Sequence, residues 1–324
     1  MSSQSKKQKT FQSPRGMHDI LPEDQKYWKY IMKKAESLLD FYNFEKIDTP
    51  VLEPTDLFSK SEGEGSDIID KEMYSFKTKG GDALSLRPEG TPSVVRAYLE
   101  HGMHVRSHPV KLYYMGQMFR HDQPQQGRYR QFYQLGAETI GDASEIIDAE
   151  LIFMAYKLLD GIGLDNYFVH INSIGDSQCR PAYLKALKEF YKSRLKKVCG
   201  TCKLRFKGNI LRMIDCKEPE CREIAKEIPQ FVDYLDDECR AHFKHVLEFL
   251  DDVKVPYILD PTLVRGLDYY TRTVFEFVPE DVENSPSLLS AGRYDKLVNL
   301  LGGRIINVKL LSIRGAFILA AINF

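Results

Sequence analysis

Four short segments of the sequence combine charged, hydroxyl and glycine residues in patterns that could do chemistry. They are Arg87–Thr91, Met118–Phe132, Leu263–Thr271 and Ala291–Asp295. The second segment contains three arginines, whose planar guanidinium groups match the oxygen atoms of phosphates and carboxylates. Each segment alone also fits a structural role, such as Thr91 as a helix N-cap or the arginines as a solvated hairpin.

Polar residues also occur in a segment that otherwise has the pattern of a core strand. Gln134 and Glu138 follow Phe132 at even spacing, and side chains with period 2 lie on one face of a strand. Burying such groups without partners is costly, so an inward position usually indicates a site. In the first segment, Glu89 and Thr91 could hold a cationic group such as an α-ammonium.

Four of the six cysteines are closely spaced, as Cys199-x2-Cys202-x13-Cys216-x4-Cys221. The first pair has the spacing of a zinc ribbon, whereas the second pair is wider. The first ten residues do not resemble a secretory signal, which favours metal binding or plain thiols over disulfides. Zinc ligation and unligated buried thiols both remain open.

The composition is that of a folded protein without a strong overall charge. The 324 residues are 43% hydrophobic and 28% charged, which excludes collagen and wholesale disorder. The 45 basic residues balance 46 acidic ones, so a globally basic nucleic-acid coat is excluded. Arg180–Arg212 is an exception, with eleven basic residues and one acidic residue. No apolar run reaches the roughly 18 residues that a membrane span needs.

Hydrophobic periodicity predicts the elements that must position these residues. Helices are predicted over residues 25–41, 92–100 and 148–160. Strands are predicted over residues 44–52, 84–86, 110–119, 129–140, 168–174, 257–259 and 274–278. The two long strands with a polar loop between them indicate an antiparallel sheet, and a helical, basic stretch interrupts the strand-rich part. This order lacks a βαβ rhythm and predicts an α+β protein.

Taken in order, the motifs resemble the histidyl-tRNA synthetase family of class II aminoacyl-tRNA synthetases. The resemblance runs from Pro14-Arg15-Gly16-Met17-His18-Asp19 to Arg304, and its most specific parts are the second and third segments. It implies an α+β class II synthetase fold, with an antiparallel sheet flanked by helices and a mostly helical insertion. It further implies a cytoplasmic, homodimeric ligase that activates histidine with ATP and Mg²⁺ and transfers it to tRNA(His).

The resemblance also assigns roles to residues. Arg120 and Arg265 would be catalytic, at the α-phosphate and the reacting carboxylate, and Arg120, Asp122 and Arg128 would bind ATP. The histidine-binding residues would be Glu89, Thr91, Gln134, Glu138, Tyr269, Tyr270 and Tyr294. Within this set, Glu89, Thr91 and Gln134 would bind the α-ammonium, and Glu138 with Tyr270 the imidazole nitrogens. Pro50 would lie at the dimer interface.

Three departures from the family pattern stand out. Asp122 occupies a position where the family usually has Glu, and Ser290-Ala291-Gly292 stands where a double glycine is usual. After Arg304 the family continues into motif 3, whose Glu-Arg pair supplies an arginine for the ATP γ-phosphate, and residues 305–324 contain no such pair. We therefore expect a chain truncated before motif 3, without the anticodon-binding domain and with impaired activity.

We predict a disordered tail over 1–12 and a catalytic domain formed by 13–172 and 254–304. We also predict a helical insertion over 173–253 and a divergent tail over 305–324. The basic part of the insertion either contacts the tRNA acceptor stem or forms a solvated face. The alternative function is a non-catalytic, histidine-binding regulatory paralogue of the ATP phosphoribosyltransferase type. The intact Glu89-Gly90-Thr91 sequence and residues 127–131 favour the ligase.

Overall fold

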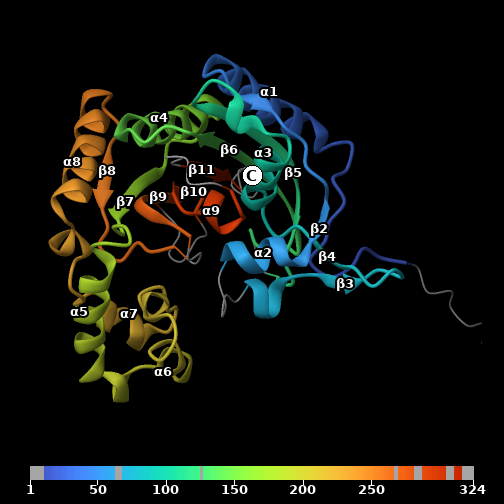
Figure 1. Cartoon of the computed structure of the whole chain (residues 1–324). Coiled ribbons are helices and arrows are strands. Elements are labelled where there is room, and N and C mark those ends of the chain that lie inside the picture. The colour runs from blue at the N-terminus through green and yellow to red at the C-terminus, as the bar shows by residue number, and fades with distance from the viewer. Residues whose placement is uncertain are drawn as a thin grey trace, which may run out of the picture.

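The computed structural model describes residues 11–62, 68–124, 127–265, 269–280, 287–303 and 310–315. In these ranges the strands form two sheets (Figure 1). The larger sheet has the order β1 (Glu45–Lys46), β5 (Val110–Phe119), β6 (Gln131–Ile140), β11 (Leu310–Gly315), β10 (Leu289–Arg293), β9 (Thr271–Pro279), β7 (Tyr167–Ser173), β8 (Tyr257–Leu259). The smaller sheet has the order β2 (Leu52–Pro54), β4 (Ala83–Leu86), β3 (Ser75–Lys77).

Antiparallel pairing dominates both sheets. β5 and β6 pair along their whole length, from Val110 opposite Ile140 to Phe119 opposite Gln131. Only the edge pairs β1–β5 and β7–β8 are parallel among the described strands. The predicted α+β fold with an antiparallel sheet is confirmed, and the two strands predicted from their length and polar loop are its longest.

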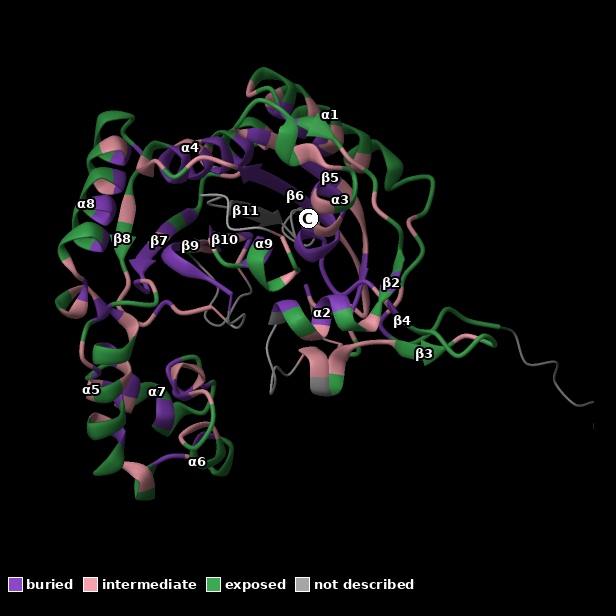
Figure 2. Ribbon diagram, viewed as in Figure 1, coloured by how far each residue is buried: buried purple, intermediate pink, exposed green. Residues whose placement is uncertain are grey.

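Helices cover the larger sheet and bury their apolar sides against it. α1 (Gln25–Phe41) follows the predicted amphipathic pattern, since Ile31, Ala35 and Leu39 recur every four residues and are buried. α4 (Glu145–Ile162) is mostly buried and lies between α1 and α8 (Asp237–Asp252) (Figure 2). No helix of the described ranges has the length and hydropathy needed to cross a membrane.

The strand predicted over residues 44–52 is wrong as a single element. β1 joins the edge of the larger sheet, while β2 pairs with β4 in the smaller one. Pro50 lies between them, and a proline has no N–H to donate to a strand partner. The chain therefore leaves one sheet and enters the other at this point.

Shorter helices lie next to the smaller sheet and next to the first and fourth polar segments. α2 (Thr55–Glu62) follows β2, and the π-helical turn η1 (Ile68–Glu72) precedes β3. α3 (Thr91–Glu100) begins directly after the first polar segment and is followed by η2 (Met103–Val105). α9 (Leu297–Leu300) follows the fourth segment and contacts α3. These connections bring segments that are far apart in sequence to one side of the sheet.

The insertion consists of short helices that extend from the β7 and β9 side of the sheet (Figure 1). They are α5 (Arg180–Lys192), η3 (Leu195–Lys197), α6 (Gly200–Arg205), η4 (Ile210–Met213), α7 (Pro219–Ala225) and η5 (Phe231–Tyr234). Arg272 on β9 binds both ends of the insertion, because its Nη2 lies 3.3 Å from Asp176 Oδ2 and 2.5 Å from Glu238 Oε1. This arginine thus fixes the neck of the insertion to the sheet.

Residues 305–324, expected to be a divergent tail, contribute a strand at the centre of the larger sheet. β11 pairs with β6 from Leu310 opposite Ile140 to Gly315 opposite Leu135, and with β10 on its other side. The remainder of that segment, residues 305–309 and 316–324, and residues 1–10 of the predicted N-terminal tail lie outside the described residues. The domain boundaries stay a prediction.

A buried ion pair joins β10 to α4. Arg293 is 1% exposed and Asp148 0%, and Arg293 Nε lies 3.0 Å from Asp148 Oδ1. The guanidinium also donates to the Ser144 carbonyl at 2.9 Å, and His242 Nε2 lies 3.6 Å from Asp148 Oδ2. A buried charge needs such partners, because desolvation without them costs several kcal/mol. Sequence reasoning did not find this pair.

Replacing Arg293 with Met leaves the Asp148 carboxylate buried without its ion partner. We expect Arg293→Met to lower the free energy of unfolding by roughly 3–5 kcal/mol, measured by urea denaturation. Lys226→Ala is the control, because the Lys226–Glu223 pair is 67% and 71% exposed and should contribute less than about 1 kcal/mol. A cost below about 1 kcal/mol for Arg293→Met would contradict the structural importance of the pair.

Candidate active site

Two fully buried carboxylates form the centre of the site. Glu89 precedes α3 and Glu138 lies on β6, and both are 0% exposed. The Tyr269 hydroxyl donates to the Glu89 oxygens at 3.1 and 3.0 Å. Thr91 Oγ1 donates to Glu138 Oε1 at 2.8 Å, and the Tyr294 hydroxyl donates to the other oxygen. Five of the predicted histidine-site residues are thereby joined by hydrogen bonds, Tyr269 to Glu89 and both Thr91 and Tyr294 to Glu138.

Two further predicted residues place polar atoms in the same buried region. Gln134 lies four residues before Glu138 on β6, on the same face, and is 2% exposed. Its Oε1 and the Tyr270 hydroxyl have no hydrogen-bond partner within the described ranges. Buried polar atoms are rarely left in this state, and a bound polar ligand is one way to satisfy them. The rings of Tyr269, Tyr270 and Tyr294 pack against one another with centroids 5.0 to 6.1 Å apart, and Tyr294 meets the other two edge to face.

Glycines let tyrosine rings approach the backbone of this region. A Cβ atom at Gly90 or at Gly136 would lie 2.2 Å from Tyr114 ring atoms, so that ring packs directly on both. A Cβ atom at Gly292 would lie 2.7 Å from Tyr270 Cδ1 and 2.9 Å from the Thr273 carbonyl oxygen. The double glycine that is usual in the family would allow such a close approach. In this chain the close approach occurs at Gly292, where the glycine is kept.

Arg120 binds the backbone of the residue before Glu89. Its Nε donates to the Pro88 carbonyl at 2.9 Å, and its guanidinium carbon lies 5.6 Å from the Phe132 ring centroid. The hydrogen bond uses one edge of the guanidinium group. Its remaining N–H donors suit an anion placed next to Glu89.

Arg265 lies near Tyr270, one of the predicted histidine-binding residues. Its Nη1 donates to Glu276 on β9, and its Nη2 lies 3.0 Å from Ser290 Oγ on β10. The guanidinium carbon lies 5.4 Å from the Tyr270 ring centroid. Burial raises the pKa of Glu276, and the charge of Arg265 opposes this shift. Sequence reasoning missed both anchors, although an acid within the strand pattern of 274–278 was a usable signal.

The predicted ATP residues Asp122 and Arg128 form a pair of their own on the hairpin after β5. Arg128 Nε lies 2.8 Å from Asp122 Oδ2, and the arginine side chain is 41% exposed. Arg130 Nε donates to the Asp122 carbonyl at 3.0 Å, which fixes the backbone of this loop. Gln125 and Gln126 of the same loop, and residues 266–268, lie outside the described residues.

Comparison with known proteins identifies the family. A model of the family described as "Histidyl-tRNA synthetase" matches residues 16–307. The chain belongs to the histidyl-tRNA synthetase family. A histidine–tRNA ligase of Dehalococcoides mccartyi is 49% identical over 294 residues, which cover 90% of this chain and 70% of that relative. The family assignment made from the motif order is therefore confirmed.

Solved structures of the same family share the fold. Apo histidyl-tRNA synthetase of S. aureus is 38% identical, with a TM-score of 0.75, and the match covers 95% of this chain and 72% of that one. A structure described as an ATP phosphoribosyltransferase regulatory subunit/histidyl-tRNA synthetase from Bacillus halodurans is 26% identical, with a TM-score of 0.69 and coverage of 95% and 82%. The identity is higher to the synthetase.

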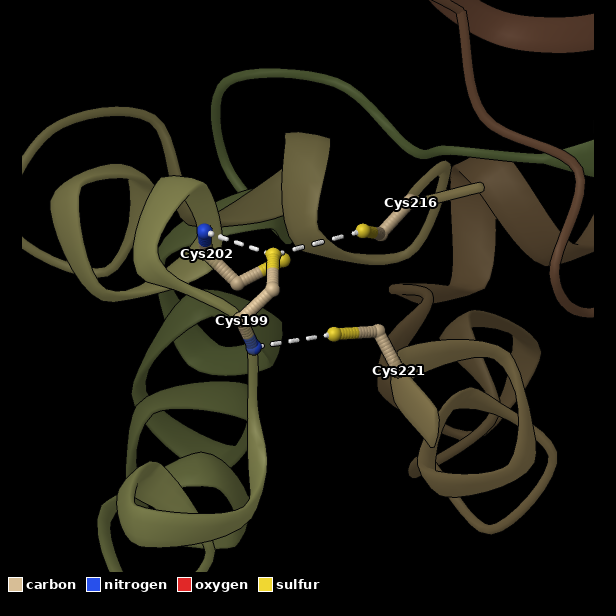
Figure 3. Close-up of side chains that lie close together, drawn as sticks. All are labelled: Cys199, Cys202, Cys216 and Cys221. Carbon is tan, nitrogen blue, oxygen red and sulfur yellow. Dashed lines mark hydrogen bonds between the residues drawn. The ribbon is translucent and has the colours of Figure 1, made fainter. Parts of the chain in front are cut away.

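The insertion of this family member brings its four closely spaced cysteines together (Figure 3). Their sulfur atoms all lie within 4.8 Å of one another. Burial raises the pKa of the Cys202 and Cys221 thiols, whereas the Cys202 backbone N–H lowers that of Cys199. The spacing in the sequence therefore marks one real cluster.

The close contact at Gly292 predicts a sharp response to a single methyl group. We expect Gly292→Ala to cost roughly 1–3 kcal/mol in urea denaturation, because Tyr270 and the Thr273 carbonyl must move. Gly161→Ala is the matched control, since a Cβ there meets nothing within 4 Å and the site lies in α4. That control should be neutral or stabilising by up to about 1 kcal/mol. Equal stability of the two variants would contradict the close packing.

Proposed function

We propose that the chain acts as a histidine–tRNA ligase, which activates histidine with ATP and transfers it to tRNA(His). The observation that carries this proposal is the pair of buried carboxylates held by Tyr269, Thr91 and Tyr294, next to the open polar atoms of Gln134 and Tyr270. Buried charges with fixed donors are pre-organised to recognise a small polar ligand.

In this proposal the two carboxylates recognise different ends of histidine. Glu89, with Thr91 and Gln134, binds the α-ammonium, since an ionised carboxylate accepts strong hydrogen bonds from a cation. Glu138 accepts the N–H of one imidazole nitrogen, and the Tyr270 hydroxyl bonds to the other. Neutral imidazole has one donor and one acceptor nitrogen, so a site built for both rejects apolar analogues.

The first reaction step needs positioning and charge stabilisation by two arginines. A carboxylate oxygen of histidine forms a bond to the α-phosphorus of ATP, and the bond from that phosphorus to the bridging oxygen breaks, which releases pyrophosphate. Arg120 contacts the α-phosphate, and Arg265, anchored by Glu276 and Ser290, neutralises the reacting oxygens. Arg128 and Asp122 serve the rest of ATP, which enters with Mg²⁺ as substrate.

The family and the exposed side chains of the protein indicate the partners of this reaction. The exposed lysines of the insertion suit the phosphates of tRNA(His). A homodimer is supported by apolar side chains next to Pro50, because Val51 and Leu52 are 39% and 41% exposed. We propose a cytoplasmic location, in keeping with these partners. Zinc binding by the four cysteines of the insertion is a separate proposal that does not depend on ligase activity.

We further propose that activation by this chain is weak. Residues 305–324 contain no Glu-Arg pair, so no arginine in a motif 3 context is there to bind the γ-phosphate. The regulatory alternative would also bind histidine without activating it. ATP–pyrophosphate exchange distinguishes the two functions. A residual ligase gives a small histidine-dependent exchange rate, and the regulatory form gives none.

Histidine binding and ATP–pyrophosphate exchange test the proposal together. We expect calorimetry to detect histidine binding, and Glu138→Gln to weaken it about 100-fold, since roughly 3 kcal/mol of charged hydrogen bonding is lost. Glu248→Gln, at an exposed site on α8, is the control and should bind as the parent does. Exchange should be detectable but far below that of an intact relative. Histidine binding that survives Glu138→Gln would contradict the assignment.

Charge reversal in the insertion tests the tRNA contact. Lys196 and Lys197 are exposed in η3, and we expect Lys196→Glu with Lys197→Glu to weaken tRNA(His) binding about tenfold or more and to lower its salt dependence. Lys226→Glu, on an exposed residue beyond the basic segment, should change binding less. Filter binding at several salt concentrations measures both. Unchanged affinity and salt slope would show that the basic segment is a solvated face.

A further inference from the structure

We propose that Cys199, Cys202, Cys216 and Cys221 bind one Zn²⁺ through four thiolates, and that this ion holds the insertion tip, residues 199–221, in its folded form. The sulfur positions fit such a centre. A tetrahedral ion with Zn–S bonds of about 2.3 Å separates its sulfurs by about 3.8 Å. The Sγ atoms of Cys199 and Cys216 are 3.8 Å apart, and all four sulfurs lie within 4.8 Å of one another (Figure 3).

Backbone donors around the cluster suit ionised sulfurs. The Cys202 N–H points at Cys199 Sγ, with a nitrogen–sulfur distance of 3.4 Å, and the Cys199 N–H points at Cys221 Sγ at 3.3 Å. Hydrogen bonds of this kind to the ligating atoms orient metal ligands and stabilise their charge. A zinc ion with four thiolates carries a formal charge of about −2, and two of the four cysteines, Cys199 and Cys202, belong to the basic segment Arg180–Arg212.

The tip is built from short helices, and its small core is shared with α5. Its helices α6, η4 and α7 contain 6, 4 and 7 residues, and isolated helices of this length are not stable. Its fully buried side chains are few, and Cys202 and Met213 are among them at 0% exposure. Small units with little core usually need a metal or disulfides. The described cysteines form no disulfide, so their thiols are available as metal ligands.

A second group of possible metal ligands lies where the insertion joins the sheet. It can be compared with the four-cysteine cluster. Asp176, Cys179, Asp236 and Cys239 also place one ligand atom each within 4.8 Å of one another. Here the carboxylates are already engaged, because Asp176 binds Arg272 at 3.3 Å and Asp236 accepts the Cys239 N–H at the start of α8. A cation would have to displace Arg272, so we place the zinc in the tip.

Metal analysis of the full chain tests the site. We expect about one equivalent of zinc per chain after equilibration with Zn²⁺ and removal of loose metal, and less than about a tenth for Cys216→Ser with Cys221→Ser. Cys179→Ser with Cys239→Ser is the matched control and should keep about one equivalent. Zinc below about a tenth of an equivalent in the parent, or its loss in the control alone, would overturn the proposal.

Measurements on the parent chain avoid dependence on a variant that fails to fold. Cobalt substitution should give the intense sulfur-to-metal absorption and the tetrahedral d–d bands of a four-thiolate site. A strong chelator should raise hydrogen exchange in residues 199–221 by about tenfold or more while β5 and β6 stay protected. Cobalt bands typical of oxygen ligands, or a tip whose exchange ignores the chelator, would contradict the assignment. These readouts need neither histidine nor ATP, so they remain informative if the ligase proposal fails.

Discussion

The desolvation of two carboxylates constrains the centre of this molecule. Glu89 and Glu138 are removed from water completely, and their hydrogen-bond donors come from the start of α3, the turn before β9 and the end of β10. Charges in this position are tolerated only when donors meet them in fixed geometry. The sheet must therefore bring three distant parts of the chain to one place, and the same requirement gathers buried polar groups there.

The insertion is tied into this arrangement by arginines. Arg180, the first residue of α5, donates from Nη2 to the Tyr270 carbonyl at 2.6 Å. Arg272, two residues after Tyr270, binds Asp176 and Glu238 at the two ends of the insertion. These hydrogen bonds thus connect the insertion to the backbone that carries Tyr269 and Tyr270. A shift of the insertion would therefore move these two tyrosines.

Local patterns were sufficient for the elements whose burial repeats along the chain. The amphipathic period of Gln25–Phe41 and the length of Val110–Phe119 gave elements with the observed bounds. The split between β1 and β2 was not foreseen, because it depends on which sheet each half joins. The partnership of Arg293 with Asp148 spans 145 residues, and no local spacing signals it. The site residues are predicted from the order of motifs, whereas the anchors Glu276 and Ser290 depend on neighbouring strands.

The departures at residues 290–292 and 305–324 show which positions need a particular side chain. Along β10, alternate residues face opposite sides of the sheet, so Ala291 packs in the core with Phe275 while Gly292 meets Tyr270. Only the second position requires glycine, and an alanine before it adds useful burial. In the same way, β11 needs backbone hydrogen bonds to β6 and β10, which almost any sequence can supply. A divergent segment can therefore complete the sheet without the residues that the chemistry of the family uses there.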